Sequence, residues 1–517
     1  MPGYLIQHPV THFAASAPDD PALACSGASM SYRELDLASN RLAQVLLADG
    51  LRPGDRVGVF QHKALEMGVT IYGILKAGGV FVPLDPFSPV ERLAFALEDC
   101  GIQRVVGGDS TAATLGALDP ATRLRTYGVS VDTPFPGCSW DAIALASEEE
   151  PAVARIDRDL AYLMYTSGST GRPKAMMHSH RGSIAYARWG RDHVGLQPGD
   201  RVASHAPLHF DLSIFDLFST VQAGATVVFV PEPITKFPAS WTQYVEDERI
   251  SVVFTVPYTL IEMLERGALD KRDLSSLRWI LFGGEPFPPK HLRTLMERLP
   301  EVRFTNVYGP AEAPSCTCYD VPRDVPVDEP LPIGTVSRNS EDLILDEDGK
   351  ACGVDEPGEL LIRSSTLTHG YWGRPERNAS CFHLVPGSGP FPHVYYRTGD
   401  QVVRRSDGLL RFLGRQDRMI KTRGHRVELD EVEAGLASHP AVEEAAAFAV
   451  PDDKGSRAIE AAVTLRDGSA VEVEELLRHA RTRLPGYALP RQLEIRADFP
   501  RTSGGKIDRR RLAEERG

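Results

Sequence analysis

Segment 165–174 reads Tyr-Thr-Ser-Gly-Ser-Thr-Gly-Arg-Pro-Lys and has the composition needed to hold a polyphosphate. Gly168 and Gly171 can adopt positive φ, so that backbone N–H groups can point at phosphate oxygens. Lys174 supplies a compact positive charge, and hydroxyl donors come from Thr166, Ser167, Ser169 and Thr170. The spacing of the second glycine and the lysine excludes a Walker A loop. The alternative is a flexible surface loop, in which Gly, Ser and Thr are common.

Further motifs occur along the chain. In chain order they are segment 76–85, Phe-Asp-Leu-Ser at 210–213, Asn-Val-Tyr-Gly-Pro-Ala-Glu at 306–312, segments 358–360 and 370–376, Tyr-Arg-Thr-Gly-Asp at 396–400, Gly-Arg-Gln-Asp at 414–417, segment 423–428 and Thr-Ser-Gly-Gly-Lys-Ile-Asp at 502–508. Over about the whole chain, this set resembles the adenylate-forming superfamily of acyl-CoA ligases and luciferases. Within that superfamily it is similar to the amino-acid adenylation domains of nonribosomal peptide synthetases.

The resemblance implies that a substrate carboxylate attacks the α-phosphate of ATP and that pyrophosphate leaves. Because the carboxylate is itself the nucleophile, catalysis depends on positioning and on charge neutralisation. Glu312 would bind Mg²⁺, an ion that prefers carboxylate and phosphate oxygens. Ala311 stands where relatives usually carry threonine, so one hydroxyl that would face phosphate is missing. The catalytic residues implied are Lys506, which would bridge the substrate carboxylate and the α-phosphate, Glu312 and Thr166.

The resemblance also implies a complete site for ATP. Tyr308 would stack on adenine, with Asn306 and Gly283-Gly284 near the edge of the base. Asp400 would accept hydrogen bonds from both ribose hydroxyls, and Arg415 would face the ribose or the phosphates. The implied ATP-binding residues are Thr166, Ser167, Gly168, Ser169, Thr170, Gly171, Lys174, Gly283, Gly284, Asn306, Tyr308, Gly309, Asp400 and Arg415.

Asp211 is the residue that indicates an amino-acid substrate. It matches the family aspartate that holds the substrate ammonium, and a fatty acid would leave this carboxylate without a partner. A charge-assisted hydrogen bond contributes about 1.5–3 kcal/mol, so a substrate with an ammonium should bind more tightly here than one without. Asp211 therefore favours an amino-acid ligase over the alternative, a carboxylate–CoA ligase. Asp211 could instead cap the helix that follows it. A catalytically silent scaffold of the same fold is a third hypothesis, against which the presence of Lys506, Glu312 and Asp400 speaks.

The substrate pocket inferred from the resemblance has mostly apolar walls. Its residues are Asp211, Leu212, Phe215, Thr255, Ile280, Phe282, Val307, Ser315 and Cys316, closed by Lys506. Apart from Lys506 the wall has no lysine or arginine, so an acidic side chain would lack a counter-charge. Phe282 should shorten the cavity. We expect a small or medium apolar amino acid, with the choice between an α- and a β-amino group left open.

The elements around these residues indicate an α/β fold. Short β-branched runs at 226–230, 252–256, 279–282 and 302–307 alternate with helical stretches at 241–249, 259–266 and 291–299. Such alternation predicts layered α/β sheets with substantially parallel strands.

A small α+β unit follows, with helices at 429–437 and 471–484 and strands at 444–450, 459–465 and 492–495. We therefore predict an N-terminal adenylation core over 1–416 that binds ATP and the amino acid. A mobile C-terminal lid follows over 417–517, and the resemblance places its hinge at Asp417.

Composition narrows the possible partners and the compartment. The net charge of −13 gives no indication that the chain binds nucleic acid or an anionic membrane. Seven scattered cysteines suggest neither a disulfide framework nor a zinc site, and the N-terminus has no signal-peptide pattern, so we expect a cytoplasmic enzyme. The histidines near the motifs lack zinc-ligand spacing. Because the sequence ends at Gly517, the expected acceptor is the phosphopantetheine thiol of a separate acyl or peptidyl carrier protein in natural-product biosynthesis.

Overall fold

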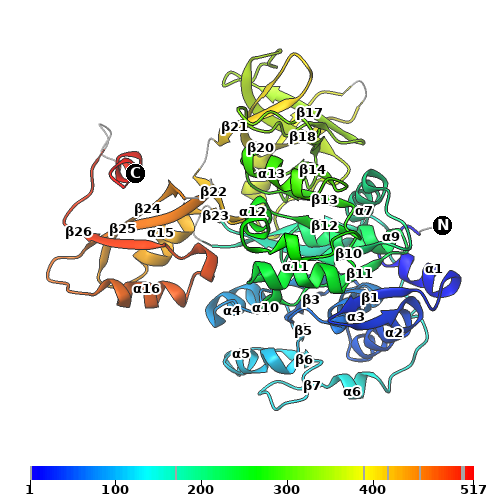
Figure 1. Cartoon of the computed structure of the whole chain (residues 1–517). Coiled ribbons are helices and arrows are strands. Elements are labelled where there is room, and N and C mark those ends of the chain that lie inside the picture. Colours follow the sequence, from blue (N-terminus) through cyan, green and yellow to red (C-terminus); the bar gives the residue numbers. More distant parts are fainter. Residues whose placement is uncertain are drawn as a thin grey trace.

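The protein consists of a large N-terminal domain and a small C-terminal domain at one side of it (Figure 1). The computed structural model describes residues 3–168, 172–387, 390–415, 418–452, 456–501 and 507–516. Both domains mix helices and sheets, which confirms the predicted fold class. The predicted hinge residue Asp417 lies outside the described residues, so the boundary between 416 and 417 stays a prediction.

The largest sheet in the described structure has nine strands in the order β16-β15-β14-β13-β12-β10-β11-β1-β2. Its central strands are parallel, as the alternating pattern predicted. The edges are antiparallel, where β15, β16 and β2 join. The strands are β1 (Pro21–Cys25), β2 (Ala28–Ser31), β10 (Arg201–Ser204), β11 (Thr226–Phe229), β12 (Val252–Thr255), β13 (Trp279–Gly283), β14 (Arg303–Tyr308), β15 (Thr317–Asp320) and β16 (Thr335–Val336).

A second large sheet has seven described strands in the order β7-β6-β5-β3-β4-β8-β9. It is parallel except for β9, which runs antiparallel to β8 and begins at Lys174, the last residue of the 165–174 segment. The strands are β3 (Arg56–Val59), β4 (Val80–Pro83), β5 (Arg104–Val106), β6 (Arg125–Tyr127), β7 (Gly137–Cys138), β8 (Leu160–Thr166) and β9 (Lys174–Ser179).

The main hydrophobic core joins these two sheets. It combines buried residues of both sheets with those of α2 (Tyr32–Ala48), α3 (Leu65–Lys76) and α7 (His180–Val194). A second core covers the other face of the nine-stranded sheet with α11 (Pro238–Asp247), α12 (Pro257–Arg266) and α13 (Pro289–Arg298). A third core places α4 (Val90–Asp99) and α5 (Ala112–Gly116) on the seven-stranded sheet. The shorter helices of this domain are α1 (His8–Ser16), α6 (Trp140–Ile143), α8 (Leu212–Ile214), α9 (Thr220–Gln222) and α10 (Glu232–Thr235).

A third sheet leads from the large domain toward the C-terminal domain. Its described strands are β17 (Ser340–Leu345), β18 (Pro357–Ser364), β19 (Phe382–Val385), β20 (His393–Arg404) and β21 (Leu410–Arg415), with α14 (Pro375–Cys381) between β18 and β19. Strands β20 and β21 are antiparallel and pair Asp400 with Arg415. The register of this hairpin therefore brings two predicted nucleotide-binding residues together.

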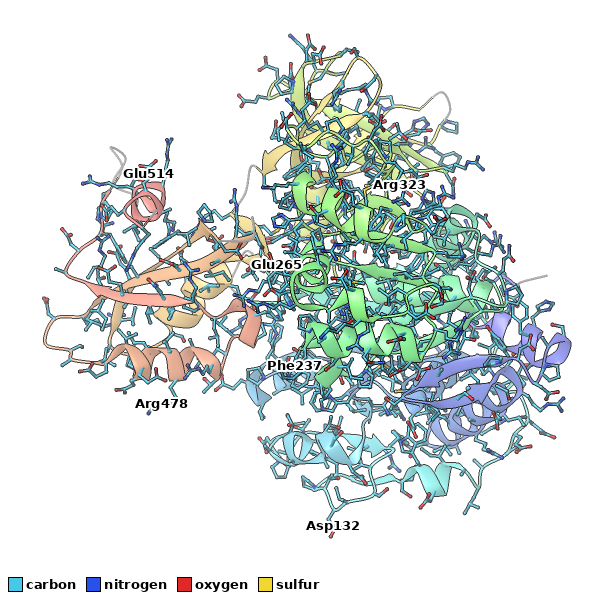
Figure 2. All side chains as sticks on the ribbon, viewed as in Figure 1. Asp132, Phe237, Glu265, Arg323, Arg478 and Glu514 are labelled. Atoms are coloured by element: carbon cyan, nitrogen blue, oxygen red, sulfur yellow. The ribbon has the colours of Figure 1, made fainter. Side chains whose placement is uncertain are left out.

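The C-terminal domain, which we call the lid, is a small α+β unit. It contains β22 (Met419–Thr422), β23 (His425–Glu428), α15 (Leu429–Ala437), β24 (Val442–Pro451), β25 (Arg457–Leu465), α16 (Val473–Arg481), β26 (Gln492–Arg496) and α17 (Arg509–Glu514). The predicted helix at 429–437 has the same bounds as α15. Figure 2 shows Arg478 of α16 and Glu514 of α17 on the outside of the lid. No described helix of the whole chain has both the length and the apolar character needed to cross a membrane.

Candidate active site

A cavity lies where the carboxyl ends of strands from both large sheets meet the lid. It is lined by residues at the ends of β8, β12, β13 and β14, and by Met419, Lys421, Gly424 and Arg426 of the lid. Ligands of α/β proteins commonly bind at this end of parallel strands. Many of the predicted site residues line this cavity, namely Thr166, Ser167, Asp211, Leu212, Gly283, Gly284, Val307, Gly309, Ser315, Asp400 and Arg415.

Asp211 lies in the cavity wall, immediately before α8. Its side chain makes no capping hydrogen bond to this helix, so the structure gives no support to the capping alternative. No ion pair joins Asp211 to another residue of the described ranges. Burial raises the pKa of the Asp211 carboxyl, and Lys421 of the lid opposes this shift only in part. A cationic group delivered by a ligand would complete the local charge balance.

Apolar side chains surround Asp211. Leu212 and Val307, which the sequence assigned to this wall, are joined by Ala311, which the sequence placed near phosphate. The wall also contains residues that the sequence missed, namely Met164, Met176, Tyr186 and Phe254. Tyr186 comes from the buried side of α7, whose helical pattern alone could not distinguish a core tyrosine from a pocket tyrosine. Tyr186 adds a hydroxyl group to this wall. Burial and the charge of Asp211 raise the pKa of Tyr186, and a hydrogen bond with Ser315 opposes this shift.

Thr255, Ile280 and Phe282 do not reach the cavity. Ile280 and Phe282 lie in the second core, on the opposite face of the nine-stranded sheet. Thr255 shares a hydrogen bond with His205, whose ring contacts Trp241 of the same core. Successive side chains of a strand point to opposite faces, so an assignment shifted by one residue exchanges the pocket face for the core face.

The cavity side of these strands is occupied by the residues next to Thr255, Ile280 and Phe282 in the sequence. Phe254 of β12 lines the cavity, and Trp279 and Leu281 of β13 belong to the main core on that side.

Phe215 and Cys316 are also buried behind the cavity wall. The Phe215 ring supports Phe254 edge-on, with ring centroids 5.3 Å apart. The Cys316 thiol lies 3.6 Å from the backbone oxygen of Tyr308, in a separate core. Both residues therefore support the lining from behind in this structure.

Asp400 lies at the centre of the residues that the sequence predicted to bind the nucleotide. Its carboxylate accepts hydrogen bonds from the Tyr308 hydroxyl and from the Arg415 guanidinium. Tyr308 itself does not line the cavity, and Asn306 donates to the backbone oxygen of Pro332 at 2.8 Å. In this structure Tyr308 and Arg415 position Asp400, while Asn306 joins β14 to the loop that contains Pro332.

Glu312 is fully buried and is held by protein groups. Its oxygens accept a hydrogen bond from the Tyr371 hydroxyl at 2.5 Å and form an ion pair with Arg426 of the lid at 2.9 Å. Burial would raise the pKa of the Glu312 carboxyl, but Arg426 and Lys174 outweigh burial and lower it to about 2. Glu312 is therefore ionised at neutral pH, and the larger share of its counter-charge comes from Arg426 of the lid.

Lys174 has a buried ammonium without a hydrogen-bond partner in the described part of the chain. It lies 4.7 Å from the centroid of the Tyr371 ring. Burial and the positive charge of Arg426 lower its pKa to about 8. A buried donor that lacks a protein partner indicates a site for an anionic ligand. Ser169, Thr170 and Gly171 of the same segment, and Lys506 of the lid, lie outside the described residues.

The lid presents the loop around Gly424 to the cavity. The Gly424 N–H donates to Glu285 at 3.3 Å, and the Ser167 hydroxyl donates to the backbone oxygen of Arg426 at 3.2 Å. Gly424 has a φ of +82°, and a Cβ there would come within 2.6 Å of Val256. Lys421 and Arg426 were within or beside a quoted motif, but sequence alone could not show that they face the cavity. Gly168 packs closely as well, since a Cβ there would lie 1.8 Å from the Arg172 oxygen.

Comparison with known proteins places this architecture in a family. The model of the AMP-binding enzyme family matches residues 10–372, and that of the AMP-binding enzyme C-terminal domain matches residues 431–506. The chain is 36% identical to an L-proline–[L-prolyl-carrier protein] ligase of Pseudomonas fluorescens, covering 99% of each. It is also 36% identical to a ligase of the same name from Streptomyces coelicolor, covering 93% of this chain and 91% of the relative.

A solved structure of the amide bond synthetase McbA from Marinactinospora thermotolerans superposes with a TM-score of 0.86. It is 26% identical and covers 99% of each chain. The protein belongs to the AMP-binding enzyme family.

Proposed function

We propose that this enzyme uses ATP to activate an apolar amino acid as its adenylate and then transfers the aminoacyl group to the phosphopantetheine thiol of a separate carrier protein. The observation that carries the proposal is the Asp211 carboxylate, which lines the cavity among apolar side chains and forms no ion pair within the described residues. The relatives that ligate L-proline to a carrier protein support the same class of substrate and acceptor. Free thiols at all seven cysteines are consistent with a cytoplasmic reaction.

The cavity residues can perform the first half-reaction by positioning. Asp211 would bind the ammonium of the amino acid, and the surrounding apolar walls would receive its side chain. Lys174 would meet phosphate oxygens, because its buried ammonium lacks a described partner. Asp400 would hold the ribose, and Lys506 would bridge the substrate carboxylate and the α-phosphate.

Glu312 has the chemistry required to hold Mg²⁺, which would neutralise phosphate charge. Its carboxylate is ionised and buried near Lys174, so the residues present fit a hard cation beside phosphates. Arg426 would have to withdraw from Glu312 for that role. Since Arg426 belongs to the lid, the metal-binding and lid-docked arrangements of Glu312 exclude each other.

The second half-reaction, transfer of the aminoacyl group to the carrier thiol, is compatible with the lid position in this structure. Gly424, which has no side chain, faces the cavity and packs against Val256. A thiol arm could approach the adenylate along this surface, whereas adenylation requires Lys506 at the same place. The two steps would therefore use two positions of the lid.

ATP–pyrophosphate exchange over a panel of amino acids, matched desamino acids and fatty acids tests the proposal. We expect exchange with an apolar amino acid, abolished by Asp211→Ala because the ammonium loses its charged partner. Lys506→Ala should slow exchange strongly for every substrate. The relative rate for the desamino acid should rise in Asp211→Ala, which separates ammonium recognition from general damage. Efficient turnover of plain fatty acids by the wild type would instead assign a carboxylate–CoA ligase.

A further inference from the structure

A buried ion pair connects the lid to the large domain outside the cluster of predicted catalytic residues. Arg92 of α4 donates to Glu431 of α15, with 2.5 Å between Nη1 and Oε1. The side chains are only 14% and 4% exposed. Arg92 belongs to the helix that covers the seven-stranded sheet, and Glu431 to the first helix of the lid. The pair therefore joins two domains at a largely buried contact.

A second ion pair crosses the same boundary but is exposed. Arg483 of the lid lies 3.6 Å from Glu91, and the side chains are 43% and 58% exposed. Glu91 directly precedes Arg92 on α4, so the two pairs are neighbours that differ mainly in burial. Exposed pairs contribute little to stability because solvent screens them. This neighbour provides a matched control for the buried pair.

The charge balance of the buried pair depends on the lid position. Burial lowers the pKa of Arg92, but Glu431 outweighs burial and the net pKa is raised, so the guanidinium stays charged in the interface. If the Glu431 charge is removed, Arg92 stays largely buried while the lid is docked and loses its main counter-charge. If the lid moves away, water can hydrate Arg92 and the lost partner matters little. Removal of the Glu431 charge should therefore disfavour the docked arrangement selectively.

We propose that Glu431 is a positioning residue for transfer to the carrier thiol, because its ion pair with Arg92 docks α15 of the lid against α4 while Gly424 faces the cavity. This inference rests on the proposed function for its assignment to the second half-reaction. Glu431 lies outside the cavity lining, whereas Arg92 reaches the cavity rim. The single test variant is therefore placed at Glu431.

The test compares Glu431→Gln with the control Glu91→Gln in two assays. ATP–pyrophosphate exchange measures adenylation, and single-turnover loading of a phosphopantetheinylated carrier protein from preformed adenylate measures transfer. We expect Glu431→Gln to slow loading at least tenfold while exchange stays within twofold of the wild type. Glu91→Gln should stay within twofold in both assays. The exchanged pair Arg92→Glu with Glu431→Arg should recover part of the loading rate that Glu431→Gln loses.

Two outcomes overturn the inference: unchanged loading in Glu431→Gln, or an equal loss of exchange and loading. Hydrogen exchange of backbone amides in α15 and α4 gives a readout independent of activity. It should accelerate in Glu431→Gln and remain unchanged in Glu91→Gln. If the wild type activates no amino acid, the proposed function fails, and the amide measurement alone decides whether the ion pair docks the lid.

Discussion

Lys174, Glu312 and Arg426 form a compact group of charges whose balance depends on the lid. Arg426 raises the local positive potential and so contributes, after burial, to lowering the pKa of Lys174 to about 8. Glu312 acts in the opposite direction but is already paired with Arg426. The consequence is that Lys174 can lose its proton within a pH range accessible to assays.

We predict that the affinity for a non-hydrolysable ATP analogue falls as pH rises through about 8. Lys174 is a cation below its pKa and neutral above it, so its attraction for phosphate is lost on the alkaline side. A lost charge-assisted hydrogen bond of about 1.5–3 kcal/mol corresponds to at least tenfold weaker binding. Titration calorimetry between pH 7 and 9.5 measures the effect. Lys174→Arg should remove the decrease, and an identical decrease in this variant would show that another group titrates.

At the level of elements, β12 and β13 divide their side chains between two environments. Phe254 faces the cavity and Thr255 faces the second core, one residue further along. The sheet therefore separates residues that line the cavity from residues that pack against the helices α11, α12 and α13.

We predict that Phe254→Ala changes substrate selection and that Thr255→Val does not. Removing the ring enlarges the cavity, so the native substrate should lose roughly 10- to 100-fold in kcat/KM, on the order of 1–3 kcal/mol for a few apolar contacts. Amino acids with larger side chains should gain relative to it. Exchange assays over a size series check this. A similar change of selectivity in Thr255→Val would contradict the division between the two faces.

The sequence predicted the positions of these helices and strands more accurately than the side to which each side chain points. Helix α15 and the parallel strands of the nine-stranded sheet follow from local patterns and occur nearly where expected. Asp211 and Asp400 lie in the cavity because short motifs fix their local backbone. Ile280 and Phe282 were misplaced because a run of apolar residues in a strand buried on both faces does not reveal which face is which. The pairing of Arg426 with Glu312 joins positions 114 residues apart and depends on domain placement, which no local pattern encodes.

At the level of the whole molecule, the large domain contains several histidines that are buried in a neutral state. Burial lowers the pKa of His178 to about 4 and that of His180 and His205 to about 3. His178 stacks on Tyr162, and His180 accepts a hydrogen bond from the N–H of Ile6. In the unfolded chain these groups would bind protons already near pH 6.5.

We predict that the melting temperature falls as pH decreases from about 6.5 toward 4. Below pH 6.5 the unfolded state binds more protons than the folded state, so acid favours unfolding, by about 1.4 kcal/mol for each unit of pKa difference. Differential scanning calorimetry over this range measures the slope. His178→Gln should flatten it, whereas the exposed His12→Gln should leave it unchanged. Equal slopes in all three proteins would assign the acid sensitivity to other groups.

Asp211, which forms no ion pair with any residue that the structure describes, also offers a way to search for the substrate without any chemical turnover. If Asp211 binds an ammonium group as proposed, a compound that supplies this group together with a side chain of the right shape should bind the folded form and not the unfolded chain. By mass action, such a compound protects the protein against heat or denaturant in proportion to its affinity. A collection of metabolites could thus be ranked by protection alone, before the carrier protein is known.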